Sequence, residues 1–152
     1  MKKLCIVLFF IVISLELKAD LLKASTLLTP KQVIMIQLNA LSKNDYPYEN
    51  FGIQQTWEFA HPNNRKFTGP LENFTKMMFS PAYSVMINHK SHKINELQIT
   101  DDMAFYFIEL INQNGTRFGF NWMLQKVKTE GNYFDCWMTT SVTIPMKYGE
   151  ST

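Results

Sequence analysis

The sequence predicts an α+β fold in which N-terminal helices pack on one face of a curved antiparallel sheet of about four strands. Apolar residues recur with helical spacing through the first half of the chain after residue 29, whereas apolar and polar residues alternate from Lys93 onward. Turn sequences separate the alternating runs. Helices followed by a strand meander are the order typical of α+β proteins.

Thr29-Pro30 predicts the start of the first helix, because threonine caps helix N-termini and proline fits the first helical position. This helix is expected to cover residues 30–42. A second helix is expected over residues 48–59, with His61-Pro62 ending it. Residues 65–69 then read as a loop before Pro70 opens a third helix.

Four strands are expected to follow in meander order. Asp101-Asp102, Asn114-Gly115 and Glu130-Gly131 are the predicted turns. The expected strands cover residues 93–100, 103–112, 116–128 and 133–144.

Residues 1–19 have the pattern of a secretory signal peptide. Lys2 and Lys3 precede an apolar run that is too short for a bilayer-spanning helix. Cleavage after Ala19 is preferred, while cleavage after Ala24 and an uncleaved anchor stay open. We therefore expect an exported protein, periplasmic or secreted, without a membrane span after cleavage.

The mature chain is expected to contain a flexible segment, one domain and a short tail, over residues 20–28, 29–147 and 148–152. Of the 15 basic and 13 acidic residues, three lysines and one glutamate lie in the signal, so the mature chain has no net charge. A neutral chain without a basic stripe argues against nucleic-acid binding. Cys136 is the one cysteine outside the signal, which excludes an intramolecular disulfide, and we interpret it as a small buried hydrophobic residue.

The Asn114-Gly115 turn predicts which side chains share a face of the sheet. A two-residue loop places Glu109 opposite Phe120 and beside Phe107 and Trp122. A carboxylate among aromatic rings would have a raised pKa, as a general acid or base requires. The alternative is that the aromatic face packs on the helices while Glu109 reaches a rim, a lysine or the sheet edge.

The position of Thr139 depends on the next turn. A two-residue turn at Glu130-Gly131 would bring Thr139 to the face of Trp122, whereas a one-residue bulge would bring Cys136 and Met138 there instead. The opposite face of the hairpin is also mostly apolar. Such a sheet needs cover on both faces, or a cavity or a homodimer interface on one.

We expect no cofactor and no metal site. His89 and His92 have metal-like spacing in a helix, but no third or fourth ligand accompanies them. Asp101 and Asp102 are adjacent and read as a turn rather than a catalytic pair.

Several motifs resemble the DUF4864 family of uncharacterised proteins. The resemblance rests on the run from Trp57 to Arg65, on Thr68-Gly69-Pro70-Leu71 with Phe74, and on Cys136-Trp137-Met138-Thr139. It implies an NTF2-like, cystatin-like α+β cone whose sheet often encloses a pocket, and it implies no established activity. Thr140 and Ser141 depart from the acidic and small residues expected after the last motif.

The sequence thus favours a non-enzymatic module that binds an apolar small molecule or a protein partner, including a second copy of the chain. The candidate ligand-binding residues are Phe107, Phe120, Trp122 and Thr139. The alternative is an isomerase or hydratase that uses Glu109 as its catalytic carboxylate.

Overall fold

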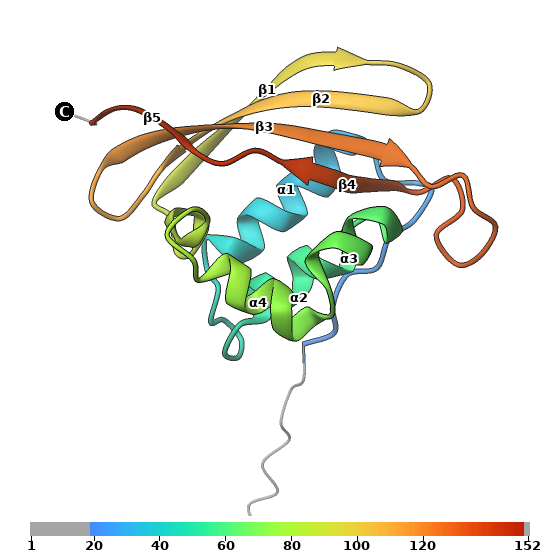
Figure 1. The fold of residues 1–152 in the computed structure, drawn as a ribbon, viewed down its shortest axis with the longest axis horizontal. Coiled ribbons are helices and arrows are strands. Elements are labelled where there is room, and N and C mark those ends of the chain that lie inside the picture. The colour runs from blue at the N-terminus through green and yellow to red at the C-terminus, as the bar shows by residue number, and fades with distance from the viewer. Residues whose placement is uncertain (1–18, 151–152) are drawn as a thin grey trace, which may run out of the picture.

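The computed structural model describes residues 19–150, apart from the side chain of Glu150, and the rest of the predicted signal peptide lies outside this range. Helices α1 (Pro30–Leu41), α2 (Phe51–Glu58), α3 (Pro62–Thr68) and α4 (Leu71–Met78) come first, followed by a short 3-10 turn at Ser84–Met86. Strands β1 (Ser91–Ile99), β2 (Met103–Ile111), β3 (Thr116–Lys126), β4 (Trp137–Val142) and β5 (Met146–Glu150) follow. The helices lie against one face of the sheet (Figure 1), so the predicted α+β fold is confirmed.

The sheet has the predicted meander order, with an edge that the sequence did not predict. The strands run β1-β2-β3-β4, and β5 also pairs with β3. Because β2 occupies one side of β3, strands β4 and β5 form the other side as one edge strand in two pieces. The break contains Pro145, which has no N–H to donate to a ladder. Residues 148–150 therefore belong to β5, which corrects their assignment to a C-terminal tail.

The start of α1 is as predicted. Thr29 Oγ1 accepts a hydrogen bond from the Gln32 N–H at 3.2 Å, and Gln32 Oε1 accepts one from the Thr29 N–H at 2.8 Å. This reciprocal capping box satisfies two backbone donors that the helix leaves unpaired.

The expected loop at residues 65–69 is wrong, because His61-Pro62 begins a helix as well as ending one. The His61 Nδ1 atom accepts a hydrogen bond from the Asn63 N–H at 3.1 Å, and Pro62 occupies the first helical position. The signature matches Thr29-Pro30, with histidine in place of threonine as the cap. Burial lowers the pKa of His61, which favours the neutral ring that accepting this bond requires.

The main core fills the space between the helices and the inner face of the sheet. Strand β2 alternates buried and half-buried residues along its whole length, as a sheet covered on one face does. Its inward residues are Ala104, Tyr106, Ile108 and Leu110, which face Phe120, Trp122 and Leu124 of β3 and Val33, Ile34, Leu38, Ile53 and Phe59 of the helices. Over residues 19–150, no helix is long and apolar enough to cross a bilayer.

Candidate functional site: a cavity between the helices and the sheet

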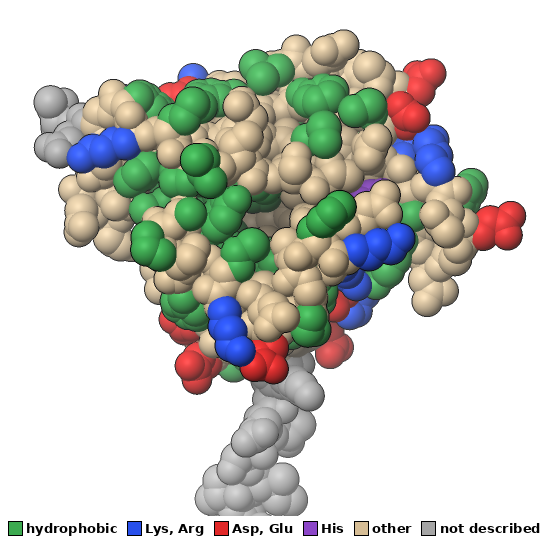
Figure 2. Space-filling view, viewed as in Figure 1, with side chains coloured by type: hydrophobic (Ala, Val, Ile, Leu, Met, Phe, Trp, Pro, Cys, Tyr) green, Lys and Arg blue, Asp and Glu red, His purple; other side chains and the backbone are tan. Residues whose placement is uncertain are grey.

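A cavity of about 250 Å³ lies between the helices and the β3–β4 side of the sheet. Figure 2 shows a hollow on this face, ringed largely by hydrophobic side chains. Among the described residues that line the cavity, none is Asp, Glu, His, Lys or Arg. The lining consists of Gln37, Leu41, Thr56, Ala60, Asn64, Phe67, Thr68, Phe74, Met77, Met78, Tyr83, Met86, Trp122, Thr139, Thr140, Ser141 and Val142.

Strand β4 is attached to the helices by backbone hydrogen bonds at Thr139. The Thr139 N–H donates to the Phe59 carbonyl oxygen, and the His61 N–H donates to the Thr139 carbonyl oxygen, each at 2.8 Å. Ala60 thereby forms a parallel bridge with Thr139. The junction between α2 and α3 thus acts as a short extra strand that fixes one wall of the cavity.

A chain of buried hydrogen bonds crosses the cavity wall from the sheet to α1. Trp122 Nε1 donates to Thr139 Oγ1 at 3.0 Å, and this hydroxyl donates to Gln37 Oε1 at 2.8 Å. Gln37 Nε2 in turn donates to the Thr56 carbonyl oxygen at 3.1 Å. The Trp122, Thr139 and Gln37 side chains are buried. Because these polar groups already have hydrogen-bond partners within the protein, they offer few free donors or acceptors to a ligand.

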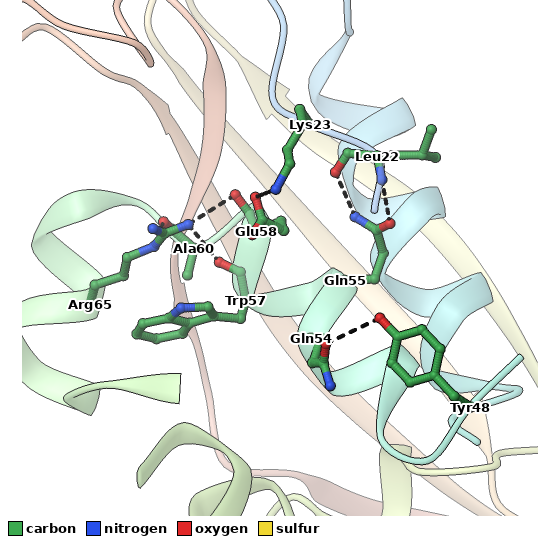
Figure 3. A network of polar contacts seen from close by, with 9 residues as sticks. All are labelled: Leu22, Lys23, Tyr48, Gln54, Gln55, Trp57, Glu58, Ala60 and Arg65. Carbon is green, nitrogen blue, oxygen red and sulfur yellow. Dashed lines mark hydrogen bonds and ion pairs between the residues drawn. The ribbon is translucent and has the colours of Figure 1, made fainter. Parts of the chain in front are cut away.

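Arg65 makes hydrogen bonds to the backbone of several other residues of the motif from Trp57 to Arg65. Its Nε donates to the Ala60 carbonyl oxygen at 3.0 Å, and its Nη2 donates to those of Trp57 and Glu58 at 2.9 and 3.1 Å, as Figure 3 shows. The guanidinium also lies 5.0 Å from the Trp57 ring centroid. A cation at a helix C-terminus satisfies its last carbonyls and its dipole. The motif therefore holds the α2–α3 junction in place, next to the cavity.

The expected register of the hairpin is wrong by one residue. Glu109 lies opposite Gly119, and Phe120 lies opposite Ile108. The loop has three residues, 113–115, with Gly115 at φ 81°. Asn112 explains the extra residue, because its Oδ1 accepts from the N–H groups of Asn114 and Thr116 at 3.1 and 2.9 Å. A slip of one residue moves every side chain of a strand to the other face.

Glu109 consequently lies on the outer face of the sheet and does not line the cavity. Its Oε2 accepts from the Tyr148 hydroxyl at 3.0 Å, and its Oε1 accepts from Asn95 Nδ2 at 2.9 Å. Lys93 Nζ lies 3.7 Å from the same Oε1. These bonds, chiefly the one from Asn95, lower the pKa of Glu109, opposite to the expected rise. Glu109 therefore serves as an anchor for Tyr148 of β5, and the expected geometry of a catalytic carboxylate is not present.

The four predicted ligand-binding residues separate into three environments. Trp122 and Thr139 both line the cavity and are joined by a hydrogen bond. The two-residue turn predicted at Glu130-Gly131 is wrong, because residues 127–136 connect β3 to β4 and a bulge follows in the ladder. Phe120 is fully buried in the core and does not line the cavity. Phe107 lies on the outer face, where a Cβ on Gly119 would stand 2.5 Å from its Cζ atom. The absence of a side chain at Gly119 thus makes room for the Phe107 ring.

The helix residues of the cavity were not predicted from the sequence. Gln37 lies on the apolar side of α1. Its helical spacing from Val33, Ile34 and Leu41 is the sequence signal that could have identified it as a buried polar residue. Met77 and Met78 of α4 also line the cavity.

His89 and His92 contact each other, and Cys136 lies in a small apolar cluster. His89 Nε2 and His92 Nδ1 lie 2.7 Å apart, and His89 Nδ1 lies 2.7 Å from the Met86 carbonyl oxygen. Burial is the main cause that lowers the pKa of His89 to about 4, so the pair is neutral near pH 7. No group of three or more His, Cys, Asp or Glu suited to a metal occurs within residues 19–150. Cys136 is buried beside Val127 and Met138, in agreement with its interpretation.

The outer face of the sheet has no helix over it (Figure 1). It carries half-buried apolar residues of β2, including Phe105, Phe107 and Ile111. A homodimer through this face stays a prediction.

Comparisons with protein-family models, curated proteins and solved structures give no match to this chain. The likeness to DUF4864 and the NTF2-like specialisation of the α+β fold therefore stay predictions.

Proposed function

We propose that this protein is an exported, non-enzymatic binding module that holds an uncharged, mainly apolar small molecule in the cavity between its helices and its sheet. The observation that carries the proposal is a 250 Å³ cavity whose described lining contains no ionisable acid or base of the Asp, Glu, His, Lys or Arg type. Burying an unpaired ligand charge in such a site would be strongly unfavourable.

The size of the cavity supports a ligand rather than a packing defect. An apolar cavity of about 150 Å³ is large enough for benzene. A molecule that binds in this space only when the protein is folded would stabilise the folded state by mass action.

The mouth of the cavity supports access from solvent. Phe67 lines the cavity although its side chain is 91% exposed. It belongs to α3, a helix in which no residue is buried. An element with so little burial opens at low cost in free energy. The adaptable side chains of Met77, Met78 and Met86 can adjust to the shape of a ligand.

The alternative of an isomerase or hydratase has less support. General acid–base chemistry needs a titratable group within hydrogen-bonding reach of the substrate. Tyr83 is the one lining residue with a titratable side chain among those described, and its hydroxyl donates to the Val142 carbonyl oxygen at 3.1 Å. Burial raises the pKa of Tyr83, which makes it a poorer acid or base near pH 7.

The proposal is tested with paired probes of equal length, 1-hexanol and hexanoate at pH 7.5, by thermal unfolding of the purified protein. A ligand of the native state raises the melting temperature as its concentration increases. We expect hexanol to raise it and hexanoate to leave it unchanged.

Replacing either of two alanines by leucine tests whether hexanol raises the melting temperature by binding in the cavity. Ala60→Leu introduces volume into the cavity wall and should abolish the shift by hexanol, whereas Ala82→Leu, at a half-buried residue outside the lining, should retain it. Equal shifts by the two probes, or an undiminished shift in Ala60→Leu, would overturn the proposal.

A further inference from the structure

The tripeptide Leu-Lys-Ala occurs twice near the N-terminus, at residues 17–19 and 22–24. Each copy offers a small residue before a bond that a signal peptidase could cleave. Because the two copies are identical, the tripeptide itself does not decide between cleavage after Ala19 and cleavage after Ala24. The contacts of the second copy in the folded protein differ from one possible product to the other, because only a product that keeps this copy can form them.

The backbone of Leu22 is held by a buried glutamine of α2. The Leu22 N–H donates to Gln55 Oε1 at 2.8 Å, and Gln55 Nε2 donates to the Leu22 carbonyl oxygen at 2.9 Å, as Figure 3 shows. The Gln55 residue is only 2% exposed. Its side-chain amide therefore pairs with one residue of the N-terminal segment as a neighbouring strand would.

The next two residues are also attached to the domain. Lys23 Nζ lies 2.8 Å from Glu58 Oε2, and the Glu58 side chain is 18% exposed. Ala24 packs against the main core and against the smaller cluster around Cys136. Leu22, Lys23 and Ala24, which we call the N-terminal strap, thus bind the domain through hydrogen bonds and an ion pair to α2 and through apolar contact with the two clusters.

Cleavage after Ala24 would remove the whole N-terminal strap. It would leave both polar atoms of the Gln55 amide without these partners at a buried position, which is destabilising. It would also remove the cation that faces Glu58. Cleavage after Ala19 keeps all of these contacts, because Asp20 and Leu21 still precede the strap.

We propose that the chain is processed between Ala19 and Asp20, and that residues 22–24 remain as a docked strap that stabilises the mature fold. The proposal rests on the proposed export alone and is independent of ligand binding in the cavity.

The first test expresses the full-length chain in a bacterial host with an export pathway and measures the intact mass of the exported protein. The expected product begins at Asp20. A product that begins at Ser25 would overturn this proposal while leaving export and ligand binding in place. An exported chain that keeps Met1 would overturn the proposed processing in favour of an uncleaved anchor, whereas a chain found only inside the cell would overturn the proposed export.

The second test compares two neighbouring glutamines in the same exported protein. Gln55→Leu removes the amide that holds the strap, and the matched control Gln54→Leu removes an amide whose Oε1 accepts from the Tyr48 hydroxyl at 3.2 Å. We expect Gln55→Leu to lower the melting temperature by about 3–8 °C more than the control.

Leu22→Pro provides a check that leaves Gln55 intact, because proline removes the backbone donor of the strap. A lowered melting temperature is expected here too, including in the case that Gln55→Leu does not fold. Melting temperatures of Gln55→Leu and Leu22→Pro equal to that of the unsubstituted protein would refute a stabilising strap.

Discussion

Replacing Thr139 by valine tests the buried hydrogen-bond chain of the cavity wall. Valine has nearly the shape of threonine but replaces the hydroxyl by a methyl group. The Thr139 hydroxyl accepts from Trp122 Nε1 and donates to Gln37 Oε1, and all three residues are at most 3% exposed. The substitution therefore removes two hydrogen bonds without opening a void.

The expected loss follows from the two polar atoms left behind. A buried donor or acceptor without a partner costs about 1–3 kcal/mol. Gln37 retains its bond to the Thr56 carbonyl, so its side chain has little freedom to turn toward another donor for Oε1. We expect Thr139→Val to lower the free energy of unfolding by about 2–4 kcal/mol.

Urea unfolding followed by far-UV circular dichroism measures this loss. The midpoint should fall while the denaturant slope stays constant, because the surface exposed on unfolding is unchanged. Thr116→Val, on β3 and outside the cavity, is the matched control and should change stability by less than about 0.5 kcal/mol. A loss for Thr139→Val no larger than that of the control would refute the reasoning.

Three further predictions concern the outer face and the histidine pair. Gly119→Ala should destabilise the protein by about 1–3 kcal/mol in urea unfolding, since its Cβ would stand 2.5 Å from the Phe107 ring; an unchanged midpoint would contradict this close approach. Glu109 should titrate below the ordinary range of a glutamate in carbon-detected NMR, because Asn95 and Tyr148 donate to its carboxylate; a raised pKa would restore the catalytic alternative. Stability should fall as the pH drops from 6.5 to about 4, by up to about 3 kcal/mol, because burial lowers the pKa of His89 and the unfolded chain binds the proton more readily; His89→Gln should flatten this part of the profile.

The layer architecture could be predicted from the sequence because local signals agree with the fold. Thr29-Pro30 begins a helix, the alternation from residue 93 onward marks strands, and the chain order of the first four strands is also their order in the sheet. These features depend on neighbours in sequence, where capping and periodicity act.

The hairpin register and the cavity depend on hydrogen bonds of single side chains, which the alternation of apolar and polar residues does not reveal. Asn112 lengthens the hairpin loop by one residue, so Glu109 and Phe120 lie on opposite faces of the sheet instead of the same face. Strand alternation left the face of Thr139 open between two turns, and the connection of residues 127–136 matches neither a two-residue turn nor its bulged form. Gln37, which bonds to Thr139, lies 102 positions away from it in the sequence. The hydrophobic periodicity of a helix or strand does not indicate which distant residue its side chains contact.

The most direct test of the central claim is a methyl NMR titration of the protein, labelled at its methionines, with 1-hexanol. The account predicts that the methyl signals of Met77, Met78 and Met86, which line the cavity, shift with a saturable dependence on hexanol. Those of Met103 and Met123, which lie outside the lining, should not shift. No saturable shift of the cavity methionines, or shifts confined to Met103 and Met123, would contradict the account.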